Sequence, residues 1–310
     1  SKYISEILDV IKKNYTFAEN TEITIEVNPG TVNKEKLEQY KKSGINRLSI
    51  GLQSTHDRLL KKIGRIHNYD DFLNTFKIAR NVGFENINID LMLGLPEQSI
   101  EDLEQSVEEV IKLNPEHISV YSLIVEEETP FYKKLEANEL NLPEDDLERK
   151  MYWAVKEKLE KSGYIHYEIS NFAKKGFESK HNLSCWNQDE YIGFGTSAHS
   201  YTNNIRYSNI DNIEEYINNF KTDNETENFV FHEKQNKESK MKEFMMLGLR
   251  KIEGISIKDF KSRFSLNPIF AYRKELEKLV DEELIEIDGD NIRLTNKGLD
   301  LANLVWEEFV

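Results

Sequence analysis

The segment Asn86–Gln98 (NINIDLMLGLPEQ) constrains the fold of this chain more than any other. Its Ile and Leu residues alternate with other residues, and this period of two predicts a strand that Gly94-Leu95-Pro96 ends, with an amphipathic helix from about Ser99. Asp90 lies within the strand, where an unpaired buried carboxylate would be costly. An acid on a strand that leads into a helix is typical of ligand sites in α/β enzymes, although a core acid that caps a neighbouring loop gives the same pattern.

The order of strand followed by helix repeats along the first part of the chain. The predicted strands, besides the one that holds Asp90, are Glu22–Asn28, Asn46–Gln53 and His117–Leu123. This alternation predicts the α/β class, with a parallel sheet or barrel whose strands all end at one rim. Glu26, Gln53 and Asp90 fall at or near these strand ends, so we expect their side chains to converge.

The pattern changes after the fourth strand. A long helix is predicted from about Pro143 to Ser162, followed by β-like segments at Ile165–Ile169 and Tyr191–Ser200. Lys221–Gln235 is polar and reads as a linker. Asn236–Val310 then resembles a winged-helix module, with three helices, a hairpin and a helix. These features predict two domains, at residues 1–222 and 223–310.

Charge and cysteine content narrow the function classes. The chain has 310 residues and a net charge of -15, and its winged-helix-like part carries 13 basic and 15 acidic residues, which disfavours nucleic-acid binding and a transcription factor. No apolar run is long enough to span a membrane, and no signal peptide opens the chain. The one cysteine, Cys185, fits a reducing, cytoplasmic location and cannot by itself supply a cluster that needs several thiolates.

Several motifs in a fixed order resemble one family. They are EVNPGT (Glu26–Thr31), GINRLSIGLQS (Gly44–Ser54), LKKIGRIHN (Leu60–Asn68), NIDLMLGLPEQ (Asn88–Gln98), HNLSCW (His181–Trp186) and GFGTSAHSY (Gly193–Tyr201). Together they resemble the radical S-adenosylmethionine (SAM) proteins related to oxygen-independent coproporphyrinogen III oxidase. The last two motifs resemble the HemW, haem-chaperone branch more than the true oxidases.

This resemblance implies a partial (β/α) barrel that holds SAM over a [4Fe-4S] cluster. Glu26 matches an acid at the SAM amino group, and Gln53 matches a polar contact to the ribose. Arg65 matches the cation at the methionine carboxylate, and Asp90 matches the acid on the ribose hydroxyls. Ile124 matches a position whose backbone lies near the adenine. The chemistry agrees, because a guanidinium pairs with a carboxylate in a two-pronged geometry and an acid accepts hydrogen bonds from a diol.

The family's C-x3-C-x2-C segment and glycine-rich strand end do not occur in this chain. Three cysteines hold the cluster in such proteins. We therefore expect an N-terminally truncated barrel that lacks its first strand–helix units, and a chain that alone neither binds the cluster nor cleaves SAM. Uncovered barrel edges would favour self-association, with a homodimer as one outcome.

The HNLSCW motif has Cys185 where the HemW pattern usually has tyrosine. His181, Cys185 and His199 are candidate haem or metal ligands, since imidazole and thiolate both serve as axial haem ligands. The alternative is a packed polar and aromatic segment.

The sequence leaves two functions open. One is a HemW-like haem chaperone that binds haem or a porphyrin and delivers it to accepting proteins. The other is an oxidase that decarboxylates coproporphyrinogen III to protoporphyrinogen IX with SAM.

Overall fold

The computed structural model describes residues 2–222 and 224–310. The chain forms two compact units, Ser1–Glu178 and Ser179–Val310. The predicted domain boundary after residue 222 falls inside the second unit and stays a prediction, because a compact unit and a sequence domain need not share their limits. No helix in the described part of the chain combines the length and apolar character needed to cross a bilayer.

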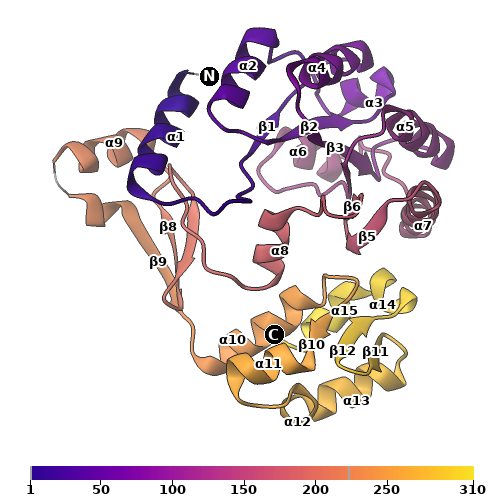
Figure 1. Cartoon of the computed structure of the whole chain (residues 1–310). Coiled ribbons are helices and arrows are strands. Elements are labelled where there is room, and N and C mark those ends of the chain that lie inside the picture. The colour runs from indigo at the N-terminus through magenta and orange to yellow at the C-terminus, as the bar shows by residue number, and fades with distance from the viewer. Residues whose placement is uncertain (1, 223) are drawn as a thin grey trace. The chain divides into compact units, whose positions relative to one another are not determined.

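The first unit alternates strands and helices (Figure 1). Its helices are α1 (Lys2–Asn14), α2 (Lys34–Lys42), α3 (Asp57–Lys62), α4 (Tyr69–Val82), α5 (Ile100–Leu113), α6 (Pro130–Glu136) and α7 (Asp145–Lys161). Its strands are β1 (Thr24–Val27), β2 (Arg47–Gln53), β3 (Asn86–Leu93), β4 (His117–Ser122), β5 (Ile165–Glu168) and β6 (Asn171–Ala173).

These strands form one sheet in the order β1-β2-β3-β4-β6-β5. The first four are parallel, and β6 and β5 continue the sheet in antiparallel pairs. Within the described residues the sheet ends at β1 and β5, so it is an open, partial barrel sheet. The predicted α/β class with a parallel core is confirmed, and the predicted strands and helices of this unit agree with the observed ones to within a few residues. Helix α6 and strand β6 were not predicted.

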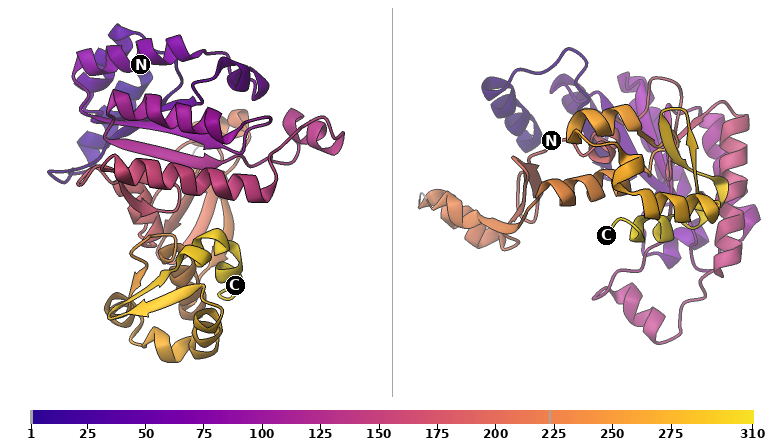
Figure 2. Two further views of the ribbon diagram at one scale, coloured as in Figure 1. Left: turned by 90° about the vertical axis from the view of Figure 1, so that its right-hand side faces the viewer. Right: turned by 90° about the horizontal axis from the view of Figure 1, so that it is seen from below.

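The two faces of the sheet differ in chemistry. Ile50, Ile89 and Ile118 lie on one face and pack against apolar residues of α2, α4, α5 and α7. In Figure 2, α5 and α7 run alongside each other over the strands. Because side chains alternate along a strand, Ser49 and Asp90 point to the opposite face. That opposite, polar face carries the candidate site.

Local sequence fixes the helices that frame this sheet. Asn68 begins α4 and accepts a hydrogen bond from the backbone N–H of Asp71, whose side chain accepts one from the Asn68 backbone. Ser99 and Asp102 form the same reciprocal pair at the start of α5. Each pair satisfies backbone donors that a helix start leaves without partners.

The second unit has two small sheets, β7-β8-β9 and β10-β12-β11. The elements before and within the first sheet are α8 (Lys180–Trp186), β7 (His199–Thr202), β8 (Ile205–Asn209), α9 (Ile213–Lys221), the 3₁₀ helix η1 (Glu225–Asn228) and β9 (Phe229–Lys234). The later elements are α10 (Lys237–Gly248), β10 (Ile255–Ser256), α11 (Ile257–Phe264), α12 (Pro268–Ala271), α13 (Arg273–Asp281), β11 (Ile285–Asp288), β12 (Asn291–Leu294), α14 (Asn296–Asp300) and α15 (Ala302–Glu307). This later order agrees with the predicted winged-helix-like module.

Two predictions for the second unit are wrong. The predicted linker Lys221–Gln235 contains strand β9, in which Phe231 pairs with Tyr207 of β8. The prediction failed because this short apolar run becomes an edge strand only through its pairing with β8. Only the end of the β-like segment Tyr191–Ser200 is a strand. Residues 192–198 are irregular, since left-handed backbone at Gly195 and Ser197 interrupts extension. Residue 223, the first of the predicted second domain, lies outside the described residues.

Candidate functional site

A network of hydrogen bonds holds Asp90 on the polar face. The Asn88 amide donates to Asp90 Oδ1 over 2.7 Å and to Ser49 Oγ over 2.7 Å. Ser49 in turn donates to Asp90 Oδ2 over 3.1 Å. The register places Asp90 beside Gly51 of β2 and Ser119 of β4. Asp90 therefore has polar partners from its own strand and from β2, and not from the neighbouring loop of the alternative that the sequence left open.

Burial is the main influence on the ionisation of Asp90. It raises the pKa of this carboxyl, while hydrogen bonds from Asn88 and Ser49 act in the opposite direction and the charge of Glu26 raises the pKa further. Because burial disfavours its charged form, further hydrogen-bond donors, such as the hydroxyls of a ligand, would stabilise this carboxylate.

His117 extends the network deeper into the sheet. Its ring nitrogens lie 2.6 Å from Asn88 Oδ1 and 2.8 Å from the Tyr167 hydroxyl. Ser119 Oγ also donates to Asn88 Oδ1 over 3.1 Å. His117 and Ser119 both contact the Asn88 amide oxygen, so the Asn88 amino group faces Asp90 and Ser49. His117 is fully buried, and burial lowers its pKa well below the usual value, so the ring is neutral.

Tyr121 contacts a predicted site residue, and the sequence analysis missed it. Its hydroxyl donates to Gln53 Oε1 over 3.0 Å. Burial raises the pKa of Tyr121 to about 12, and the charges of Asp90, Arg65 and Glu26 also act on it. Three of the predicted polar residues therefore influence this hydroxyl through their charges, and the fourth, Gln53, accepts its hydrogen bond. A signal was present, because Tyr121 shares the period-two face of His117–Ser122 with two other polar residues.

Gly51 makes room for the groups around Tyr121. A Cβ at this position would lie 3.0 Å from Gln53 Nε2, 3.4 Å from Asn28 Oδ1 and 3.8 Å from Arg65 Nη2. Arg65 Nη1 also donates to Asn28 Oδ1 over 2.8 Å. The strand bulges between Gly51 and Gln53, and Gln53 has a left-handed backbone with φ 70°. Such bulges and strained residues at strand ends frequently aim side chains at functional sites.

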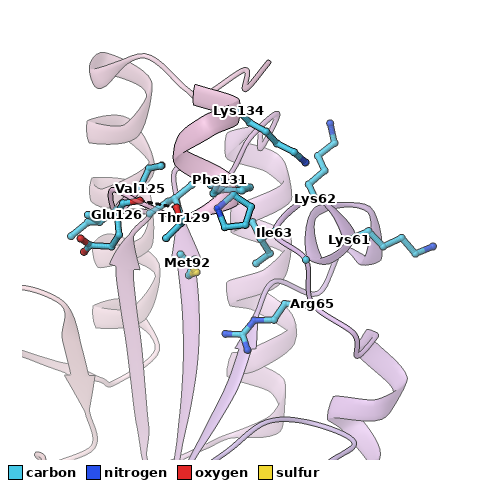
Figure 3. A pocket seen from close by; sticks show the side chains of 14 residues that line it. Lys61, Lys62, Ile63, Arg65, Met92, Val125, Glu126, Thr129, Phe131 and Lys134 are labelled. Carbon is cyan, nitrogen blue, oxygen red and sulfur yellow. Dashed lines mark hydrogen bonds between the residues drawn. The ribbon is translucent and has the colours of Figure 1, made fainter. Parts of the chain in front are cut away.

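A separate group of residues lines an open pocket of about 580 Å³ (Figure 3). Arg65 and Ile124 both line it, so the structure brings these two predicted residues together. Glu26, Gln53 and Asp90 are not among its lining residues. The predicted set therefore divides into a polar group around Tyr121 and a pocket group, with Arg65 belonging to both.

The candidate haem residues lie in the second unit. His181 and Cys185 are one turn apart on α8, with the Cys185 sulfur 4.0 Å from His181 Nε2. His199, on β7, stacks instead on His232 with ring centroids 5.2 Å apart. Burial raises the pKa of the Cys185 thiol. Throughout the described ranges, no three His, Cys, Asp or Glu side chains are arranged to hold a metal ion.

Comparisons with known proteins agree with this architecture. The Radical SAM superfamily model matches residues 1–110, and the HemN C-terminal domain model matches residues 235–301. The solved structure of coproporphyrinogen III oxidase (HemN) from Escherichia coli is similar with a TM-score of 0.82 and 21% identity, covering 99% of this chain and 73% of that chain. At that identity the likeness shows the fold alone.

Curated relatives are similar over almost the whole chain. The heme chaperone HemW of Bacillus subtilis (strain 168) is 40% identical over 94% of this chain and 76% of its own length. The heme chaperone HemW of Lactococcus lactis subsp. lactis (strain IL1403) is 35% identical over 100% of this chain and 81% of its own length. With these matches and its radical SAM fold, the chain belongs to the HemW family.

Proposed function

We propose that this chain handles haem, as a HemW-type haem chaperone, and that it binds SAM on the polar face of its sheet. The haem part is supported by the relatives, which are named heme chaperones and match 94% and 100% of the chain. The SAM part is supported by one observation above all. Asp90 is held by Asn88 and Ser49 beside Gly51, whose missing Cβ lets Gln53 and Arg65 come close to the strand.

Each predicted residue has a chemical role in this proposal. Asp90 accepts hydrogen bonds from the ribose hydroxyls, and Gln53 supplies a further polar contact to the ribose. Arg65 pairs with the methionine carboxylate, and Glu26 attracts the amino group. The backbone at Ile124 lies along the adenine. When bound, SAM supplies a sulfonium centre whose carbon–sulfur bond is open to reductive cleavage.

The residues of this chain do not fit a [4Fe-4S] cluster. Such a cluster is held by several thiolates, and the sequence contains one cysteine, Cys185, which lies in the second unit. No step that needs the cluster is therefore assigned to these residues. Their contribution is to bind and orient SAM and to hold its ribose and carboxylate in place.

The second unit offers His181 and Cys185 as haem-ligand candidates. They share one face of α8, so one of them can serve as an axial ligand with the other beside it. His199 stays a weaker candidate because its ring stacks on His232. The predicted haem-accepting proteins, homodimer and cytoplasmic location stay predictions from the sequence.

The SAM part is tested by equilibrium dialysis with SAM. We expect Asp90→Asn to bind SAM about tenfold more weakly than the wild type, because a charge-assisted hydrogen bond to the ribose is weakened. Asp211→Asn, at an exposed position in the second unit, is the matched control and should bind like the wild type. Equal affinities for all three proteins, or no SAM binding by the wild type, would overturn this part.

The haem part is tested by a spectroscopic haem titration of the wild type, His181→Ala and His199→Ala. We expect the wild type to bind haem and His181→Ala to shift the Soret band and weaken binding, with little change for His199→Ala. Equal Soret positions and affinities in the wild type and His181→Ala would remove the ligand role of His181.

The oxidase alternative rests on the likeness to the solved oxidase structure, which shows the fold alone.

A further inference from the structure

The pocket of the first unit is cationic in a strongly acidic chain. Lys61, Lys62, Arg65 and Lys134 line it, against one carboxylate, Glu126. The whole chain has a net charge of -15. Such a local reversal of charge attracts anions and holds them near the pocket. SAM does not account for it, because SAM has one carboxylate, which the proposed function assigns to Arg65, and is otherwise cationic.

Two of these lysines lie on different helices, on the same side of the pocket. Figure 3 shows Lys62, at the end of α3, and Lys134, on α6, extending toward the upper part of the pocket, while Lys61 points away from it. Lys62 pairs with Glu97, and both side chains are partly exposed. An exposed ion pair of this kind contributes little, so a ligand carboxylate can replace Glu97. Lys134 has no ion-pair partner among residues 2–222 and 224–310.

The same pocket offers an apolar surface below the lysines. Ile63, Met92 and Phe131 line it beside Ile124, and all three are half-buried. Apolar side chains that stay partly exposed and gather at a pocket indicate a ligand that covers them. The complementary ligand is therefore amphipathic, with a broad apolar body and more than one carboxylate at an edge.

We propose that this pocket binds a tetrapyrrole by its carboxylate edge. Lys62 and Lys134 bind the two propionate groups, and Ile63 and Phe131 pack against the ring. This inference rests on the proposed haem-handling function and adds to it the place and the chemistry of recognition. It requires no metal in the ring, so it is independent of the ligand candidates in the second unit.

The experiment uses deuteroporphyrin IX, a metal-free tetrapyrrole with two propionates, and its dimethyl ester, which lacks both charges. Binding is followed by porphyrin fluorescence in the full chain. We expect Lys62→Gln/Lys134→Gln to bind the diacid about tenfold more weakly than the wild type, because two ion pairs are lost. Added salt should weaken wild-type binding of the diacid and leave the ester unaffected.

The matched control is Lys77→Gln/Lys133→Gln, which makes the same charge change at two exposed lysines of the first unit that do not line the pocket. This control should bind the diacid like the wild type. Equal losses in both double variants, or equal wild-type affinities for the diacid and the ester, would overturn the lysine contacts and leave the proposed function intact. Absence of diacid binding by a wild type that still binds haem would also overturn the inference alone, and absence of both would overturn the proposed function as well.

Discussion

At Asp90, burial and hydrogen bonding act in opposite directions on one carboxyl group. Burial raises its pKa, and the donors Asn88 and Ser49 oppose that rise. The orientation of Asn88 depends in turn on His117 and Ser119, which occupy its oxygen. The acid that stands out in the sequence is thus held in place by four neighbours that do not stand out.

Gly51 is the residue at which the site is most sensitive to added volume. We expect Gly51→Ala to displace the Gln53 amide, which would lie 3.0 Å from the new Cβ, and so to disturb its hydrogen bond with Tyr121. SAM binding should weaken about fivefold to tenfold, since the loss is of the order of one hydrogen bond. Equilibrium dialysis with SAM measures this effect.

The comparison variant for Gly51 is Tyr121→Phe, which removes the hydrogen bond to Gln53 without adding volume. Similar losses in both variants would show that the orientation of Gln53 matters, while a loss in Gly51→Ala alone would indicate that the added methyl group blocks the ligand. Wild-type affinity in Gly51→Ala would contradict the role assigned to the space at this residue.

At the scale of elements, the sequence predicts helix starts well because their signals are local. Asn68 and Ser99 each begin a helix with an acid three residues later, and both reciprocal pairs form. The helices α6 and α8 escaped prediction because their apolar residues do not recur at a clear helical period. Strand β9 was missed for a different reason, since its partner β8 decides whether a short apolar run pairs.

The start of α5 gives a prediction at this scale. We expect Ser99→Ala to lower the free energy of unfolding by about 1 kcal/mol, because the backbone N–H of Asp102 loses its acceptor. Urea denaturation of the purified chain measures the change. Ser99→Thr keeps the accepting oxygen and should remain close to the wild type. A full loss in Ser99→Thr would mean that packing, and not capping, explains the effect.

At the scale of the whole molecule, buried histidines such as His117 and His166 make the free energy of unfolding depend on pH. Burial lowers the pKa of His166 to about 4 and that of His117 well below 6.5. At pH values between their folded and unfolded pKa values, both rings are neutral in the folded chain and protonated in the unfolded chain. The unfolded state then binds more protons, so the free energy of unfolding falls as the pH decreases from about 6.5 to about 4.

The share of His166 in this pH dependence can be measured separately. For His166 alone we expect the free energy of unfolding to be about 1 to 2 kcal/mol lower at pH 5 than at pH 7.5. Urea denaturation at both pH values should show a smaller fall for His166→Gln, whose side chain does not titrate. An equal fall in the wild type and in His166→Gln would contradict the assignment.

The sequence by itself determined the alternation of strands and helices, the winged-helix-like end of the chain, and Asp90 as the acid of interest. These follow from local periodicity, capping and turn residues, which need no knowledge of distant segments. The tertiary structure alone decided that Tyr121 lies among the predicted residues, that Gly51 leaves space for them, and that Lys62 and Lys134 line one pocket. The physical reason is register. Which side chains meet across neighbouring strands and loops depends on pairing between segments that lie far apart in the sequence.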